Sequence, residues 1–241
     1  MLRFSDARNF GRTLTGLCLI AGPLLFVISS VVGPNTDHDN KAKELADVAA
    51  HKSAYLTNAY MFLAAAVLVI IASIGLIRFF RGPRGVTAGQ IGGTLLVLGS
   101  SVLFAFFAFT ITEYEMVNQK GVDRGAMAFF LHRLDKSNSG WPLFILFLLG
   151  IGVGLLLLAV AMYRTRAVPV WAAGAVGVGA VLNFFGGTGI EIAANALLFV
   201  GLAVLAVGIL RMSDEEWDSP RERKGAPAGP EPAAPTPAPA G

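Results

Sequence analysis

Glu191 has the strongest claim to a chemical role, because no other Asp, Glu, Lys or Arg lies between Ala167 and Leu210. An ionisable side chain within such an apolar stretch is costly and by default indicates a function. Asn195 follows one helical turn later, on the same face. Two interpretations stay open. The carboxylate lines a polar site, or it caps the amino end of its own helix, where backbone N–H groups stabilise negative charge.

Other polar residues fall near the same ends of neighbouring apolar stretches. Asn183 closes the fifth stretch, Asn58 and Tyr60 open the second, and Glu113 ends the third. If these stretches are membrane helices, their polar residues share one depth. We therefore predict an outward-facing polar pocket that binds or passes a small molecule or lipid. Its residues are Glu191, Asn195, Asn183, Asn58, Tyr60 and Glu113.

A metal site is a second hypothesis for the same side. Histidine and carboxylate ligands suit zinc, and His51, Glu113 and His132 supply three of them. Such a site would give an outer-face, metal-dependent hydrolase. The alternative is that both histidines are solvated and pair with Asp47 and Asp135, which stand at helical spacing from them.

Other kinds of chemistry are not indicated. The sequence has no nucleotide-binding loop, no serine-hydrolase elbow and no zinc-protease motif. Cys18 is the single cysteine, which excludes an intrachain disulfide and a cysteine metal site. The arginines form short clusters between apolar runs, so nucleic acid is not an expected partner. We predict no catalytic residues, no cofactor and a function that is not enzymatic.

Apolar stretches dominate the chain that must position these residues. Only 15% of the 241 residues are charged, and the mean hydropathy is +0.63. A helix needs about 20 mostly apolar residues to cross a bilayer. Six stretches meet that length, and we predict an all-α polytopic membrane protein with six transmembrane helices. They are expected at about 13–32, 54–78, 87–112, 141–163, 168–186 and 190–211.

Basic residues set the orientation. The short connections around Arg81 and Arg164 carry arginine and no acidic residue, which is typical of cytoplasmic loops. Both termini are then cytoplasmic, with residues 1–12 as the N-terminal segment. The first stretch is too long for a cleaved signal and lacks a clear cleavage site, so we expect it to be retained.

The loops and the tail differ in character. Apolar residues recur at helical spacing in 37–53 and in 122–136, which predicts two amphipathic helices in the outer loops. Residues 212–241 are rich in Pro and Ala, and we expect a disordered cytoplasmic tail.

Glycines indicate close helix contacts. Gly85, Gly89 and Gly93 open the third stretch, and Gly150 and Gly154 lie in the fourth. Small residues four apart let membrane helices approach closely. The contacts are either within the bundle or with a second copy or another membrane protein. Contacts with a second copy or another membrane protein, together with the Pro-rich tail, would favour an accessory or scaffold subunit of a membrane complex. The nearby segment 99–101, Gly-Ser-Ser, can provide a bend or a polar contact near the midplane.

Two segments carry a resemblance to known proteins. The segment 16–22, GLCLIAG, and the segment 163–171, YRTRAVPVW, are similar to patterns in uncharacterised small multipass bacterial membrane proteins of the domain-of-unknown-function type. The resemblance implies a protein of the bacterial cytoplasmic membrane, in contact with membrane lipid. It implies no functional residues.

Overall fold

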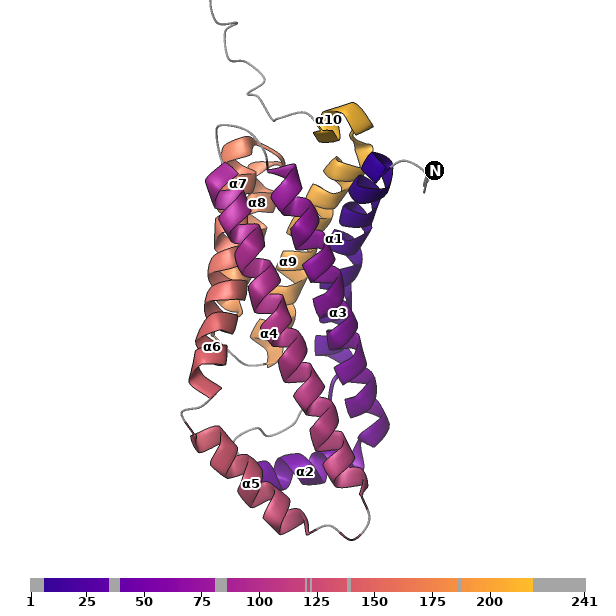
Figure 1. Ribbon diagram of the computed structural model, residues 1–241, viewed down its shortest axis with the longest axis vertical. Helices are drawn as coiled ribbons and strands as arrows, with labels where there is room; N and C mark the ends of the chain where they lie inside the picture. The colour runs from indigo at the N-terminus through magenta and orange to yellow at the C-terminus, as the bar shows by residue number, and fades with distance from the viewer. Residues whose placement is uncertain are drawn as a thin grey trace, which may run out of the picture.

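The computed structural model describes residues 7–34, 40–80, 86–119, 121, 123–137, 140–185 and 188–218, and this part of the chain is a bundle of helices (Figure 1). The helices are α1 (Ala7–Val32), α2 (Lys41–Ala50), α3 (Lys52–Phe79), α4 (Val86–Asn118), α5 (Arg124–Lys136), α6 (Trp141–Phe147), the π-helical turn η2 (Leu148–Val153), α7 (Gly154–Thr165), α8 (Val170–Leu182), α9 (Thr188–Arg211) and α10 (Asp214–Asp218).

Five helical segments are long and apolar enough to cross a membrane: α1, α3, α4, the continuous run α6–η2–α7, and α9. Their outer surfaces expose large apolar side chains such as Leu17, Ile74, Leu98 and Val200. Water would disfavour so much exposed apolar surface, whereas lipid does not. The chain is therefore a membrane protein.

The sixth expected helix is shorter than the sequence suggested. It was expected over 168–186, but α8 has 13 residues, or about 20 Å of helix. Pro169 immediately precedes α8, and Asn183 follows it. Proline favours the start of a helix because it has no N–H to leave unpaired. By length, α8 falls below the other five.

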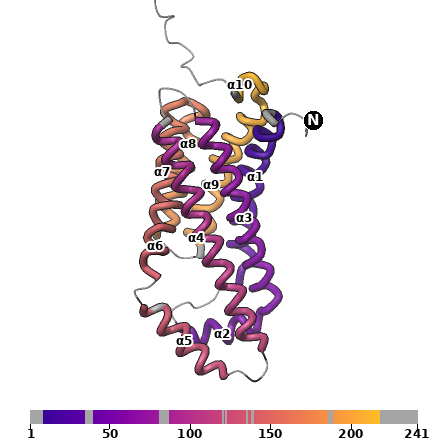
Figure 2. Tube along the Cα trace, viewed as in Figure 1, coloured from indigo at the N-terminus to yellow at the C-terminus, as the bar shows by residue number. Residues whose placement is uncertain are grey.

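The spanning segments and α8 form a closed ring. Along it, α1 packs on α3, α3 on α4, α4 on the α6–η2–α7 run, α7 on α8, α8 on α9, and α9 on α1. Figure 2 shows the same order in the trace, with the first and last long helices side by side. A ring of this kind surrounds a central space, and the lining side chains determine how much of that space is filled.

Glycines bring two of these segments into backbone contact. A Cβ added to Gly150 of η2 would overlap the backbone of Gly99 in α4, and a Cβ on Gly99 would lie 2.6 Å from the amide nitrogen of Ile151. A second close approach lies two helical turns before Gly99 and one turn after Gly150. There, a Cβ on Gly92 would lie 2.9 Å from the carbonyl oxygen of Gly154. Of the glycines expected to promote close approach, Gly150 and Gly154 do so within the chain, and Gly89 and Gly93 lie against side chains of Phe80 and Ile77; Gly85 lies outside the described residues. A partner through other surfaces stays a prediction.

One end of the bundle, here called the termini end, holds the start of α1 and the end of α9. It is closed by large side chains from the last turns of α3, α7 and α9. These are Phe79, Phe80, Met162, Leu205 and Ile209, each no more than 5% exposed.

Helix α10 adds a polar and aromatic cover at the termini end. Arg12 of α1 pairs with Asp214 at 3.2 Å, and Trp217 lies 5.8 Å from Phe79, centroid to centroid. Ser213 and Glu216 cap α10 reciprocally, each accepting the other's backbone N–H. The expectation of disorder from residue 212 thus does not hold for 214–218; residues 219–241 lie outside the described part. The segment expected before residue 13 also differs, because α1 begins at Ala7.

The opposite end, here called the α2/α5 end, carries the two loop helices expected within 37–53 and 122–136. Leu45 and Val48 of α2 pack with Leu131 of α5 and Val117 of α4 in a small separate core. Asn40 and Asp123 cap the two helices, as their side chains accept backbone N–H bonds from Lys43 and Gly125. Figure 1 shows α2 and α5 beyond the lower end of α9.

We predict that Gly150→Ala lowers the stability of the bundle. The added methyl group must push α4 and η2 apart, and overpacking of this kind costs about 1–3 kcal/mol. The measurement is the apparent unfolding temperature of the purified protein in detergent, followed by circular dichroism. Gly174→Ala in α8 is the control, because nothing lies within 4 Å of a Cβ there. Equal unfolding temperatures for the two variants would contradict the assigned contact.

Candidate functional site

The ring encloses a cavity of about 430 Å³, within the range usual for small-molecule sites. All six members of the ring contribute to its wall. Most lining residues are apolar, among them Leu19, Ala72, Leu155 and Leu202. No Lys, Arg or His from the described part of the chain lines it. The cavity therefore suits a guest with a largely apolar body.

Phenylalanines surround the cavity toward the α2/α5 end. We call this set the aromatic collar: Phe26, Phe62, Phe107, Phe144, Phe147 and Phe184. The rings of Phe62 and Phe107 stack with centroids 4.0 Å apart, and Phe26 lies 5.5 Å from Phe62. These ring contacts connect α1, α3 and α4 in the cavity wall, at the same end as the polar lining residues.

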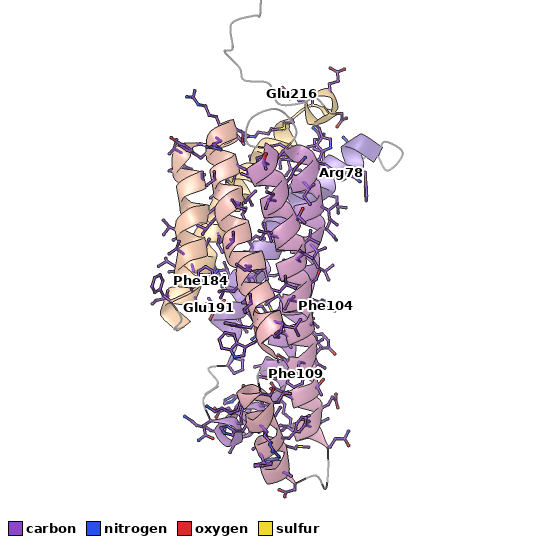
Figure 3. The ribbon with its side chains drawn as sticks, turned by 60° about the vertical axis from the view of Figure 1, so that its left-hand side comes forward. Arg78, Phe104, Phe109, Phe184, Glu191 and Glu216 are labelled. Carbon is purple, nitrogen blue, oxygen red and sulfur yellow. The ribbon has the colours of Figure 1, made fainter. Side chains whose placement is uncertain are left out.

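Phe184 is one of the lining residues at which the cavity reaches the surface. It is 45% exposed, and its ring lies so close to Gly152 of η2 that no Cβ would fit there. Asn183 and Glu191, on either side of the α8–α9 connection, are also exposed and also line the cavity. Figure 3 shows Phe184 and Glu191 together at the lower end of α9. We call this opening the mouth.

A chain of hydrogen bonds holds the polar groups at the mouth. The Ser30 hydroxyl of α1 lies 2.9 Å from Glu191 Oε1 and 3.0 Å from the Phe26 carbonyl oxygen. Asn195 Nδ2 donates to Ser30 Oγ at 2.8 Å. Glu191 lies in the first turn of α9, where the helix dipole also favours a carboxylate. Glu191 therefore lies near the start of its helix and also lines the cavity, and a cap on the helix N–H groups stays a prediction.

The other expected pocket residues have different positions. Asn58 does not line the cavity but accepts a hydrogen bond from Ser29, the neighbour of Ser30. Tyr60 is 56% exposed and lies outside the lining. Glu113 is buried near α2 and α5, where it accepts a hydrogen bond from the Tyr55 hydroxyl at 2.7 Å. The structure thus brings Glu191, Asn195 and Asn183 to one cavity and leaves Asn58, Tyr60 and Glu113 out of its lining.

The three residues of the metal hypothesis do not come together. No group of three or more His, Cys, Asp or Glu side chains suited to a metal occurs in the described residues. The ring nitrogen Nδ1 of His51 lies 3.2 Å from the Asp47 carbonyl oxygen, and His132 is exposed on α5. Glu113 is engaged with Tyr55 instead.

Several residues of the site were not identified from the sequence. Ser30 links Glu191 to Asn195, and its position near the end of the first apolar stretch, at the depth of Glu191, was the available signal. The aromatic collar had no comparable signal, because the sequence does not distinguish these phenylalanines from exposed ones such as Phe104 and Phe109. Only the ring closure makes these six side chains face one space.

Comparison with known proteins gives a family and no function. No curated protein and no solved structure matches this chain. A family model described as "Domain of unknown function (DUF4386)" matches residues 14–213, which include α1 from residue 14 on and the other five ring segments in full. The chain belongs to this DUF4386 family.

Proposed function

We propose that this protein binds a small amphipathic molecule in its central cavity, with the apolar part inside the ring and the polar part at the mouth. The observation that carries the proposal is the cavity itself: about 430 Å³, apolar walls from six helical segments, and polar groups gathered at the mouth. A purely polar guest would leave hydrogen bonds unmade against these walls, which is unfavourable.

Binding is favoured over passage because the two ends of the ring differ. At the termini end, Phe80, Met162 and Ile209 are almost fully buried and fill the space between helices. At the α2/α5 end, Asn183, Phe184 and Glu191 are exposed beside the cavity. A guest can therefore enter and leave by the mouth without opening the bundle.

We further propose six crossings of a bacterial cytoplasmic membrane, with both termini in the cytoplasm and the mouth facing outward. The start of α1 and the end of α9 meet at one end, joined by Arg12 and Asp214. This supports an even number of crossings, with α8 as the short sixth. Arg78, Arg164 and Arg211 also end their helices at that side, as expected for a cytoplasmic face.

The binding proposal predicts that an amphiphile protects Cys18. This thiol lines the cavity and is 3% exposed, and it is the single cysteine of the chain. In lipid nanodiscs, dodecanol should slow its modification by a small neutral methanethiosulfonate, followed by mass spectrometry. The control is Leu17→Cys in a Cys18→Ala background, because Leu17 is 47% exposed on the lipid side. Slowing at Leu17→Cys but not at Cys18 would overturn the proposal.

The topology proposal predicts that reporters at both termini lie on the same, cytoplasmic side. Green fluorescent protein fused to either terminus should fluoresce, and alkaline phosphatase fused to either should be inactive. Active phosphatase at one terminus alone would mean an odd number of crossings.

A further inference from the structure

We infer that the guest carries a positively charged, hydrogen-bond-donating amine head group that binds Glu191, and a second polar group that reaches Ser100 deeper in the cavity. The inference rests on the proposed function and names the class of molecule bound: a long-chain amine with a further hydroxyl or carbonyl group along its apolar chain. It draws on two independent features, the hydrogen bonding at the mouth and a buried hydroxyl in the wall.

The mouth has more acceptors than donors. An ionised carboxylate offers about four acceptor positions. Among the described residues, Glu191 receives at most one hydrogen bond, from Ser30, whose single proton is also within reach of the Phe26 carbonyl oxygen. The amide of Asn195 donates to Ser30, so its carbonyl oxygen is a further acceptor at the same place. Even with the amide groups of Asn183 and Asn195 counted as donors, acceptor positions are in excess, so a head group that donates hydrogen bonds fits the mouth better than one that only accepts them.

The charge at the mouth narrows the choice of head group further, to hydrogen-bond donors that carry a positive charge. Glu191 contributes one negative charge, and no Lys, Arg or His of the described residues lines the cavity to balance it. The first turn of α9 makes this charge tolerable, but does not neutralise it. A hydrogen bond to a charged group is roughly twice as strong as a neutral one. A primary ammonium supplies both the charge and the donors, whereas a carboxylate head group would be repelled.

Ser100 provides the second contact. It is 0% exposed and lines the cavity from the middle of α4, yet its hydroxyl has no hydrogen-bond partner in the described part of the chain. The next residue, Ser101, behaves as helical serines usually do and donates to the Val97 carbonyl oxygen at 2.8 Å. A buried hydroxyl without a partner is unfavourable, and such groups in native proteins are generally satisfied by water or ligand. Ser100 is thus placed to bond a polar group on the guest.

Head-group selectivity is tested with three probes of equal chain length: dodecylammonium, dodecanol and dodecanoate. Protection of Cys18 in nanodiscs gives the affinity of each, expressed per concentration in the lipid. Dodecylammonium should bind about tenfold or more tightly than dodecanol, and dodecanoate most weakly. Glu191→Gln should remove this preference, and an unchanged unfolding temperature in circular dichroism would show that the variant is folded. Glu115→Gln, an exposed carboxylate outside the cavity, makes the same charge change and should retain the preference.

Outcomes of this experiment separate the two proposals. If all three probes protect Cys18 equally, the cavity binds amphiphiles and the head-group inference is wrong. If Glu115→Gln removes the preference as Glu191→Gln does, surface charge is the cause, and the inference is again wrong. If no probe protects Cys18, the proposed function itself fails.

The contact at Ser100 has its own test. Dodecylammonium with a mid-chain hydroxyl should bind about two- to tenfold more tightly than the parent amine, the value of one neutral hydrogen bond. Ser100→Ala should remove that gain, and Ser101→Ala should keep it. No gain in the wild-type protein, or a gain that survives Ser100→Ala, would mean that Ser100 does not contact the guest.

Discussion

The contact between Gly99 and Gly150 is the constraint on which the bundle depends. Lipid surrounds the helices and supplies no hydrophobic drive for their association, so the helices must be held by close packing. At this point the backbones of α4 and η2 touch, since neither residue leaves room for a Cβ. The contact coincides with the π-helical turn, a local irregularity of a kind often found at functional sites. The run α6–η2–α7 is fixed against α4 at this point. Its last part, α7, also packs on α8, and these two contacts close the ring.

A closed ring of six segments cannot bring every wall into contact with every other, and the unfilled centre is the cavity. The two ends of the cavity differ because the helices carry different side chains in their terminal turns. Bulky apolar side chains such as Phe80 and Ile209 fill the termini end. At the mouth, Ser30 of α1 hydrogen-bonds to both Glu191 and Asn195 of α9, and the acceptor positions that these bonds leave unused lie beside an apolar interior. Apolar walls with polar groups at one end form an environment that matches an amphipathic molecule better than a soluble polar one.

Sequence patterns predicted the parts of this architecture that depend on local composition. Five long helices and the loop helices α2 and α5 follow from apolar length and periodicity, and the glycine spacing indicated close packing. The convergence of Glu191 and Asn195 on one site also followed, because both lie on one helical face. The roles of Tyr60 and Glu113 did not follow: shared depth does not decide whether a side chain points inward, to lipid or to a loop helix. The short α8 and the helical α10 depend on neighbours that hydropathy does not describe.

A map of the full chain in lipid nanodiscs, determined by electron cryomicroscopy with dodecylammonium present, tests most directly whether the cavity is a binding site. A bound guest should appear as a continuous elongated density inside the ring, beginning beside the Glu191 carboxylate and passing Ser100. A ring that has collapsed so that lining residues such as Leu155 and Leu202 fill the centre, with no density beside Glu191, would contradict the proposed binding.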